Sequence, residues 1–73
     1  MFWPHRRVDR IEALHELEAS VYGGLDRARE IKDEASASKL EEVRDWIDTH
    51  RGSAKELLSA KRAAVDRILA ELR

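Results

Sequence analysis

The sequence contains no cysteine, a single proline and only three glycines. Without cysteine, the chain has no disulfide framework, no thiolate metal site and no thiol nucleophile. A single proline leaves long segments in which a helix can continue without interruption. The absence of these residues therefore predicts a small helical protein that is held together by packing alone.

Aromatic residues and long apolar runs are also scarce. Aromatics make up 5% of the chain and charged residues 40%, and no segment alternates apolar and polar residues over the length of a strand. The longest run of large apolar residues covers positions 1–3, far fewer than the ~20 residues of a membrane-spanning helix. No secretory signal is visible either. We therefore expect an all-α protein without a membrane span, located in the cytoplasm or within an assembled particle.

Two apolar series with helical spacing occupy the two halves of the chain. The first falls within a sector of about 160° and consists of Ile11, Leu14, Leu17, Val21, Leu25, Ala28, Ile31 and Ala35. The second begins at Leu40 and continues through Val43, Ile47, His50, Ala54, Leu57, Leu58, Lys61, Val65, Ile68 and Leu72. Between Ala35 and Leu40 the apolar direction turns by roughly 100°, which predicts an interruption at residues 36–38. The spacing Ser38-x-x-Glu41 is a capping box and predicts the start of a second helix.

These patterns predict one domain, 1–73, formed by an antiparallel hairpin of two long helices at about 5–35 and 39–73. In this hairpin the two ends of the chain would meet, and Trp46 would lie opposite Ala28. Gly23-Gly24 and Gly52 could kink or break the helices, since two glycines inside a helix cost ~2 kcal/mol relative to alanine. Gly52 is also followed by a further capping box, Ser53-x-x-Glu56. The alternative is a small bundle of three or four helices.

Each apolar sector, about 140° to 180° wide, exceeds what two isolated helices can bury on each other. We therefore expect a second copy, as in a four-helix bundle, or a larger protein to cover the remainder. His50 and Lys61 lie on the second stripe, where they would tune the choice of partner or lie at its edge. Phe2 and Trp3 would fold onto the last helix or anchor a partner. The candidate partner-binding residues are Phe2, Trp3, Leu14, Leu17, Val21, Trp46, Leu57, Ile68 and Leu72.

The basic residues suggest a second kind of partner. In the predicted hairpin they gather at the end that holds both termini, and this basic pole consists of Arg6, Arg7, Arg10, Arg62, Arg67 and Arg73. Arginines can neutralise phosphates, so RNA or DNA binding is an alternative function. Against it, the net charge is −1, and carboxylates are interspersed with the arginines.

Sites for chemistry are not apparent. Glu12-x-x-His15 places two metal ligands on one helix face, but a di-iron bundle needs a second such pair, which the sequence lacks. No serine lies in a nucleophile elbow, and no glycine-rich phosphate loop occurs. We therefore expect a non-enzymatic interaction module without a cofactor or metal. It would act in assembly or as an adaptor, as small phage and accessory proteins do, or as an inhibitor that covers a partner's functional surface.

Overall fold

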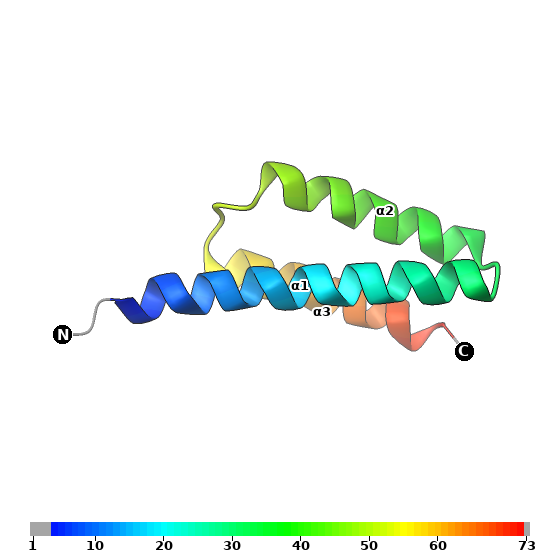
Figure 1. Cartoon of the computed structure of the whole chain (residues 1–73), viewed down its shortest axis with the longest axis horizontal. Helices are drawn as coiled ribbons and strands as arrows, with labels where there is room; N and C mark the ends of the chain where they lie inside the picture. Colours follow the sequence, from blue (N-terminus) through cyan, green and yellow to red (C-terminus); the bar gives the residue numbers. More distant parts are fainter. Residues whose placement is uncertain (1–3, 73) are drawn as a thin grey trace.

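A computed structural model describes the backbone of residues 4–72 and the side chains of residues 9–72. These residues form α1 (Pro4–Glu30), α2 (Glu34–Thr49) and α3 (Lys55–Ala70), as Figure 1 shows. The all-α prediction is confirmed, with no strand in the described part of the chain, and the three-helix alternative is consistent with it. The two-helix hairpin does not match the structure, because the second arm is divided at Gly52.

Helix α1 is the element on which the other two pack. α2 runs back along α1, and α3 then runs in the same direction as α1 (Figure 1). Both α2 and α3 contact α1 more extensively than they contact each other. The end of α3 therefore lies beside Gly24 of α1, where Leu69 approaches, and not beside the start of α1 at Pro4. The prediction that the two ends of the chain meet is wrong for this reason.

One apolar core joins the three helices. Its buried members are Ala13, Leu14, Leu17, Val21, Leu25, Leu40, Val43, Ile47, Leu58 and Val65. Nearly all of them belong to the two apolar series of the sequence. The wide apolar sector of α1 is thus covered from two sides by α2 and α3 of the same chain. In the predicted two-helix hairpin, part of this sector remained exposed and needed a partner protein to cover it.

The first reversal of the chain occurs at residues 31–33, earlier than predicted. Lys32 has a φ of 60°, the left-handed conformation that commonly ends a helix. The Asp33 N–H donates to the Ala28 carbonyl at 2.8 Å and the Lys32 N–H to the Arg29 carbonyl at 3.2 Å, which is the Schellman pattern. Ser38, the predicted cap, lies inside α2 and is exposed. The predicted interruption at 36–38 is therefore wrong.

Asp33 caps α2. Its carboxylate accepts the Ser36 N–H at 3.0 Å and the Ser36 hydroxyl at 2.8 Å. The first of these bonds satisfies a backbone donor that the first turn of a helix otherwise leaves free, and the second ties the Ser36 side chain to the cap. The N–H of Ser36 first, and then its hydroxyl, lower the pKa of the Asp33 carboxyl.

The second reversal surrounds Gly52. α2 ends at Thr49, and its C-cap is His50, whose N–H donates to the Ile47 carbonyl at 3.1 Å. The Ser53 N–H donates to the His50 carbonyl at 3.0 Å. Gly52 thus breaks the second arm, as the bundle alternative predicted. The capping box at Ser53 does not form, because the residue that precedes α3 is Ala54, which makes no side-chain cap.

The two adjacent glycines of α1 have different surroundings. α1 passes through both without a break. Gly23 is exposed, and a Cβ added there would meet nothing within 4 Å. Gly24 is buried, and a Cβ there would overlap Cδ2 of Leu69 and lie 3.0 Å from Cδ1 of Leu40. Gly24 is thus the point at which α2 and α3 both press against the backbone of α1.

Alanine substitution should separate the two positions. Gly23→Ala is expected to stabilise the fold by roughly 0.5–1 kcal/mol, since it raises helix propensity without a new contact. Gly24→Ala should lose that gain, because the Leu69 and Leu40 side chains must move, and Gly24→Leu should destabilise by about 1–3 kcal/mol. Urea denaturation of the three variants measures these differences. Equal stabilisation by alanine at both positions would contradict the convergence at Gly24.

Acid should weaken the cap of α2. The folded-state pKa of Asp33 lies below its ordinary value of 3.8, so the carboxylate adds stability above that value. This contribution is lost as the pH falls through the lower folded-state pKa. Asp33→Asn, which carries no charge, should therefore lose less stability than the natural chain between about pH 7 and about pH 2. Thermal melts across this range measure the effect, and Ser36→Ala, which keeps the carboxylate and the backbone N–H, is the control.

Candidate functional site

Ion pairs bridge two of the three lines along which the helices meet, which we call seams. Across the α1–α2 seam, Arg29 meets Glu41 at 3.1 Å, and Arg51, just beyond α2, meets Glu18 at 2.7 Å. Across the α1–α3 seam, Arg62 Nη1 donates to Glu16 Oε1 at 2.6 Å. Exposed pairs of this kind each contribute about 0–1 kcal/mol.

A second ion pair closes the α1–α3 seam near the start of α3. Lys55 Nζ lies 3.9 Å from Asp9 Oδ2. Close by, Arg10 Nη1 donates to the Arg51 carbonyl at 2.9 Å, which ties the loop before α3 to α1. Both seams that involve α1 are therefore bridged at two levels along the bundle.

The α2–α3 seam differs, because no ion pair crosses it among the described residues. Instead, Lys61 Nζ of α3 lies 4.8 Å from the ring centroid of Trp46 in α2. The His50 ring stacks on Trp46, with centroids 4.0 Å apart and an interplanar angle of 4°. A cation over an exposed indole contributes about 0.5–1 kcal/mol. This seam thus presents an aromatic pair and a lysine to solvent.

The His50 ring is held in place by its Nδ1 atom. Nδ1 lies 2.8 Å from the Trp46 carbonyl oxygen and 2.8 Å from Thr49 Oγ1. A carbonyl only accepts hydrogen bonds, so Nδ1 carries the proton in this contact. The Thr49 hydroxyl donates to the same carbonyl at 3.0 Å. The end of α2 therefore fixes the face that His50 presents to the indole.

Apolar side chains extend the seam along α3. Leu57 precedes Lys61 by one helical turn and Ile68 follows it by two, so all three lie on one side of α3. Lys61 reaches Trp46, and this side of α3 therefore faces α2. Leu57 is 46% exposed, while Trp46 and Ile68 are half-buried. We call Trp46, His50, Leu57, Lys61 and Ile68 the α2–α3 seam cluster.

The predicted partner-binding residues divide into two groups. Leu14, Leu17 and Val21 belong to the core of this chain, so they are covered without a partner. Trp46, Leu57 and Ile68 lie together in the seam cluster, and Leu72 is half-buried one turn beyond Ile68. Lys61 of α3 lies over the Trp46 ring, for which the sequence had predicted Ala28 as the facing residue. Phe2 and Trp3 fall outside the described residues.

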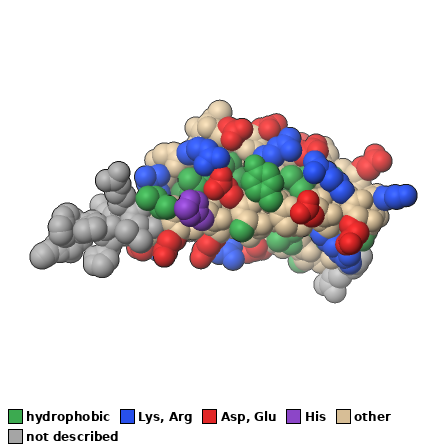
Figure 2. Space-filling view, viewed as in Figure 1, with side chains coloured by type: hydrophobic (Ala, Val, Ile, Leu, Met, Phe, Trp, Pro, Cys, Tyr) green, Lys and Arg blue, Asp and Glu red, His purple; other side chains and the backbone are tan. Residues whose placement is uncertain are grey.

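The predicted basic pole does not form in the described part of the chain. Arg10 and Arg62 are engaged along the α1–α3 seam, and Arg67 lies in the last turn of α3. The pole assumed that the two ends of the chain meet, which the direction of α3 prevents. Arg73 and the side chains of Arg6 and Arg7 are outside the described residues. Figure 2 shows Lys and Arg interspersed with Asp and Glu over the face formed by α1 and α2.

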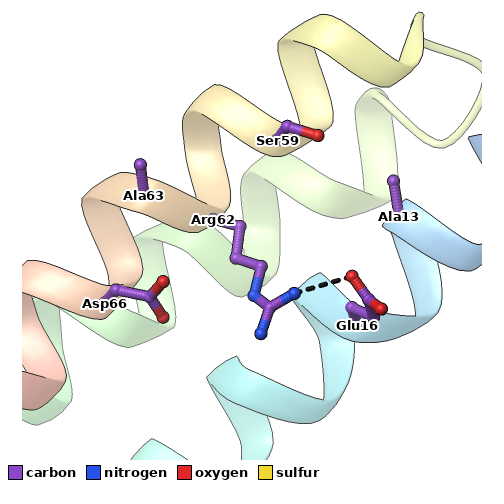
Figure 3. Close-up of a pocket in the computed structure, with 6 residues that line it drawn as sticks. All are labelled: Ala13, Glu16, Ser59, Arg62, Ala63 and Asp66. Atoms are coloured by element: carbon purple, nitrogen blue, oxygen red, sulfur yellow. Dashed lines mark hydrogen bonds and ion pairs between the residues drawn. The ribbon is translucent and has the colours of Figure 1, made fainter.

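A shallow groove beside the α1–α3 seam contains the Glu16–Arg62 pair (Figure 3). Ala13 and Ala63 leave space on either side, and Asp66 projects from α3 one turn after Arg62. The guanidinium points toward Glu16, and its Nε atom has no hydrogen-bond partner among the described residues. Ion pairing between the helices accounts for this arrangement.

Metal-binding and membrane-spanning features are absent from the described residues. Glu12 and His15 are exposed on α1, and within residues 9–72 no three His, Asp or Glu side chains group as metal ligands do. None of the helices in the described chain combines the length and the apolar character that a membrane crossing requires. Comparison with protein-family models, with curated proteins and with solved structures gave no match.

Truncation should distinguish core leucines from seam leucines. Leu17 is fully buried, so Leu17→Ala is expected to destabilise the fold by about 2–5 kcal/mol. Leu57 is 46% exposed, so Leu57→Ala should cost about 1 kcal/mol or less. Urea denaturation followed by circular dichroism measures both losses. A cost at Leu57 equal to that at Leu17 would place Leu57 in the core and remove it from the candidate surface.

Proposed function

We propose that this chain is a non-enzymatic helical protein–protein interaction module that docks another helix on its α2–α3 seam, as an assembly component or adaptor. The observation that supports this function is the difference between the three seams. Both seams of α1 are bridged by ion pairs, whereas the α2–α3 seam carries an aromatic pair, Leu57 and Ile68. Indole rings and apolar side chains on a partly exposed helix surface are common anchors of protein–protein interfaces.

The proposal rests on a smaller surface than the sequence indicated. In the predicted hairpin, the wide apolar sectors of both arms needed a partner to cover them. α3 now covers much of the sector on α1, since Leu58 and Val65 are fully buried. What is left for a partner is the side of α3 that carries Leu57 and Ile68, together with Trp46 on α2. A single helix laid along this line would complete a four-helix arrangement.

The seam can be tested against a matched position. Leu57 and Tyr22 are exposed to similar extents, 46% and 50%, but Tyr22 lies on α1, away from the seam. Leu57→Glu should therefore abolish partner binding, because it puts a charge into the docking line, while Tyr22→Glu should leave binding within a few-fold of the natural chain.

The measurement has two stages. Light scattering after gel filtration shows whether the chain self-associates. A pull-down from an extract of the native host, carried out with the natural chain, Leu57→Glu and Tyr22→Glu, shows whether the chain captures a larger protein. Thermal melts of both variants confirm that they are folded. Self-association or capture that depends on Leu57 and not on Tyr22 supports the proposal. A monomer whose captured proteins are unaffected by Leu57→Glu contradicts it.

A further inference from the structure

We infer that His50 is a proton-sensitive switch: when its imidazole becomes an imidazolium ion, it weakens the hold of Lys61 on Trp46 and loosens α3 from α2. The switch belongs to the isolated chain, so it goes beyond the proposed interaction function and does not depend on it. The inference is drawn from the contacts that bring an imidazole and an ammonium group to the same indole ring.

The hydrogen bond of the His50 ring defines its neutral state. Nδ1 carries a proton that it donates to the Trp46 carbonyl at 2.8 Å, so Nε2 is the nitrogen that can bind a further proton. An unperturbed histidine binds this proton near pH ~6.5. A histidine therefore changes from neutral to cationic between about pH 8 and about pH 5.

The surroundings of the ring keep the imidazolium in place. His50 is the C-cap of α2, and the negative end of the helix dipole favours a cation there. The hydrogen bond from Nδ1 to the Trp46 carbonyl becomes charge-assisted and therefore stronger. The ring also lies parallel to the indole, with centroids 4.0 Å apart, and the face of an indole attracts a cation. Protonation thus leaves His50 on Trp46 and adds a positive charge beside the indole.

Lys61 is the side chain that responds to this charge. Its Nζ lies 4.8 Å from the centroid of the same indole, and a lysine ammonium stays charged over this range of pH. An imidazolium on the ring repels the ammonium. Lys61 moves more readily than His50, because its charge is at the end of a flexible four-carbon stem. α2 and α3 contact each other less than either contacts α1, so the loss of this contact loosens the seam.

The other charged groups near His50 do not supply this response. They are Glu42, Asp45, Asp48 and Arg51 along the chain, Arg10 and Glu18 of α1, and Lys55 and Glu56 of α3. Arg51 is paired with Glu18 at 2.7 Å, and Lys55 lies 3.9 Å from Asp9. Carboxyl groups ordinarily lose their proton near pH ~4, and Arg and Lys keep theirs well above pH ~8. Within this set, only His50 is of a type that changes charge between about pH 8 and about pH 5.

The test uses Trp3→Phe in the full chain, which leaves Trp46 as the single tryptophan. A charge on the ring stacked against an indole changes the indole emission, so the fluorescence of Trp46 between about pH 8 and about pH 5 reports the charge of His50. The transition should fit the binding of one proton. It should be absent in His50→Gln, because an amide does not titrate.

Lys61→Met removes the ammonium group and keeps an unbranched side chain. It is expected to move the midpoint of the Trp46 transition to higher pH by at least about 0.3 unit, which is about a twofold coupling, because a neighbouring cation no longer opposes the imidazolium. Arg67→Met removes a charge from an exposed position on a different side of α3. This control should leave the midpoint within about 0.1 unit.

The same coupling is measurable as stability, because a coupling free energy is reciprocal. Lys61→Met should lower the folding equilibrium constant by a factor that is at least about twofold larger at pH ~8 than at pH ~5. In His50→Gln the two factors should be equal. Urea denaturation at the two pH values measures them, and the comparison cancels any packing gain from methionine that does not depend on pH.

Three outcomes would overturn the inference. The absence of a Trp46 transition, or a transition that persists in His50→Gln, would show that His50 does not carry the signal. A midpoint that Lys61→Met leaves unchanged would show that Lys61 is not coupled to it. Circular dichroism confirms that each variant is folded. None of these measurements involves a partner, so the comparison of Leu57→Glu with Tyr22→Glu decides separately whether the interaction function stands.

Discussion

The close approach of three helices at Gly24 is the constraint on which the rest of the bundle depends. Leu40 of α2 and Leu69 of α3 both contact the backbone of α1 at a position that has no side chain. A larger residue there would push one helix away and expose the leucines that meet it. Because both helices can approach, α1 buries a sector too wide for a single partner helix. The same geometry makes α1 the shared wall and leaves α2 and α3 in weaker contact with each other.

The apolar periodicity predicted the core well, since burial and helical spacing are two consequences of the same packing. It placed the reversals poorly, because a reversal depends on a few local hydrogen bonds. The first turn lies at Lys32, a lysine in the conformation that usually requires glycine, so no glycine marked it. Charge signals did mark it. Arg27 and Arg29 end α1, and Asp33 and Glu34 begin α2, as the helix dipole favours.

The candidate site was predictable only in part. Residues of a core and residues of an interface both appear in the sequence as apolar side chains at helical spacing. The sequence therefore could not distinguish Leu17, which is buried, from Leu57, which is half-exposed. The sequence did place His50 and Lys61 on an apolar stripe, where a charged group or an imidazole requires a favourable contact with another side chain. It could not show that Trp46 provides that contact for both residues. The contact between Lys61 and Trp46 requires α3 to fold back on α2, which follows from the break at Gly52.

The uneven bridging of the seams links stability to binding. A domain of 73 residues has a small core and a narrow margin of stability. Ion pairs bridge both seams of α1, whereas α2 and α3 meet through the shared apolar core and through Lys61 over the Trp46 ring. The proposed partner helix would contact α2 and α3 together, so it would bind the folded chain and not the unfolded one and would stabilise the bundle by mass action. The proposal thus places the partner at the seam where the helices of the chain contact each other least.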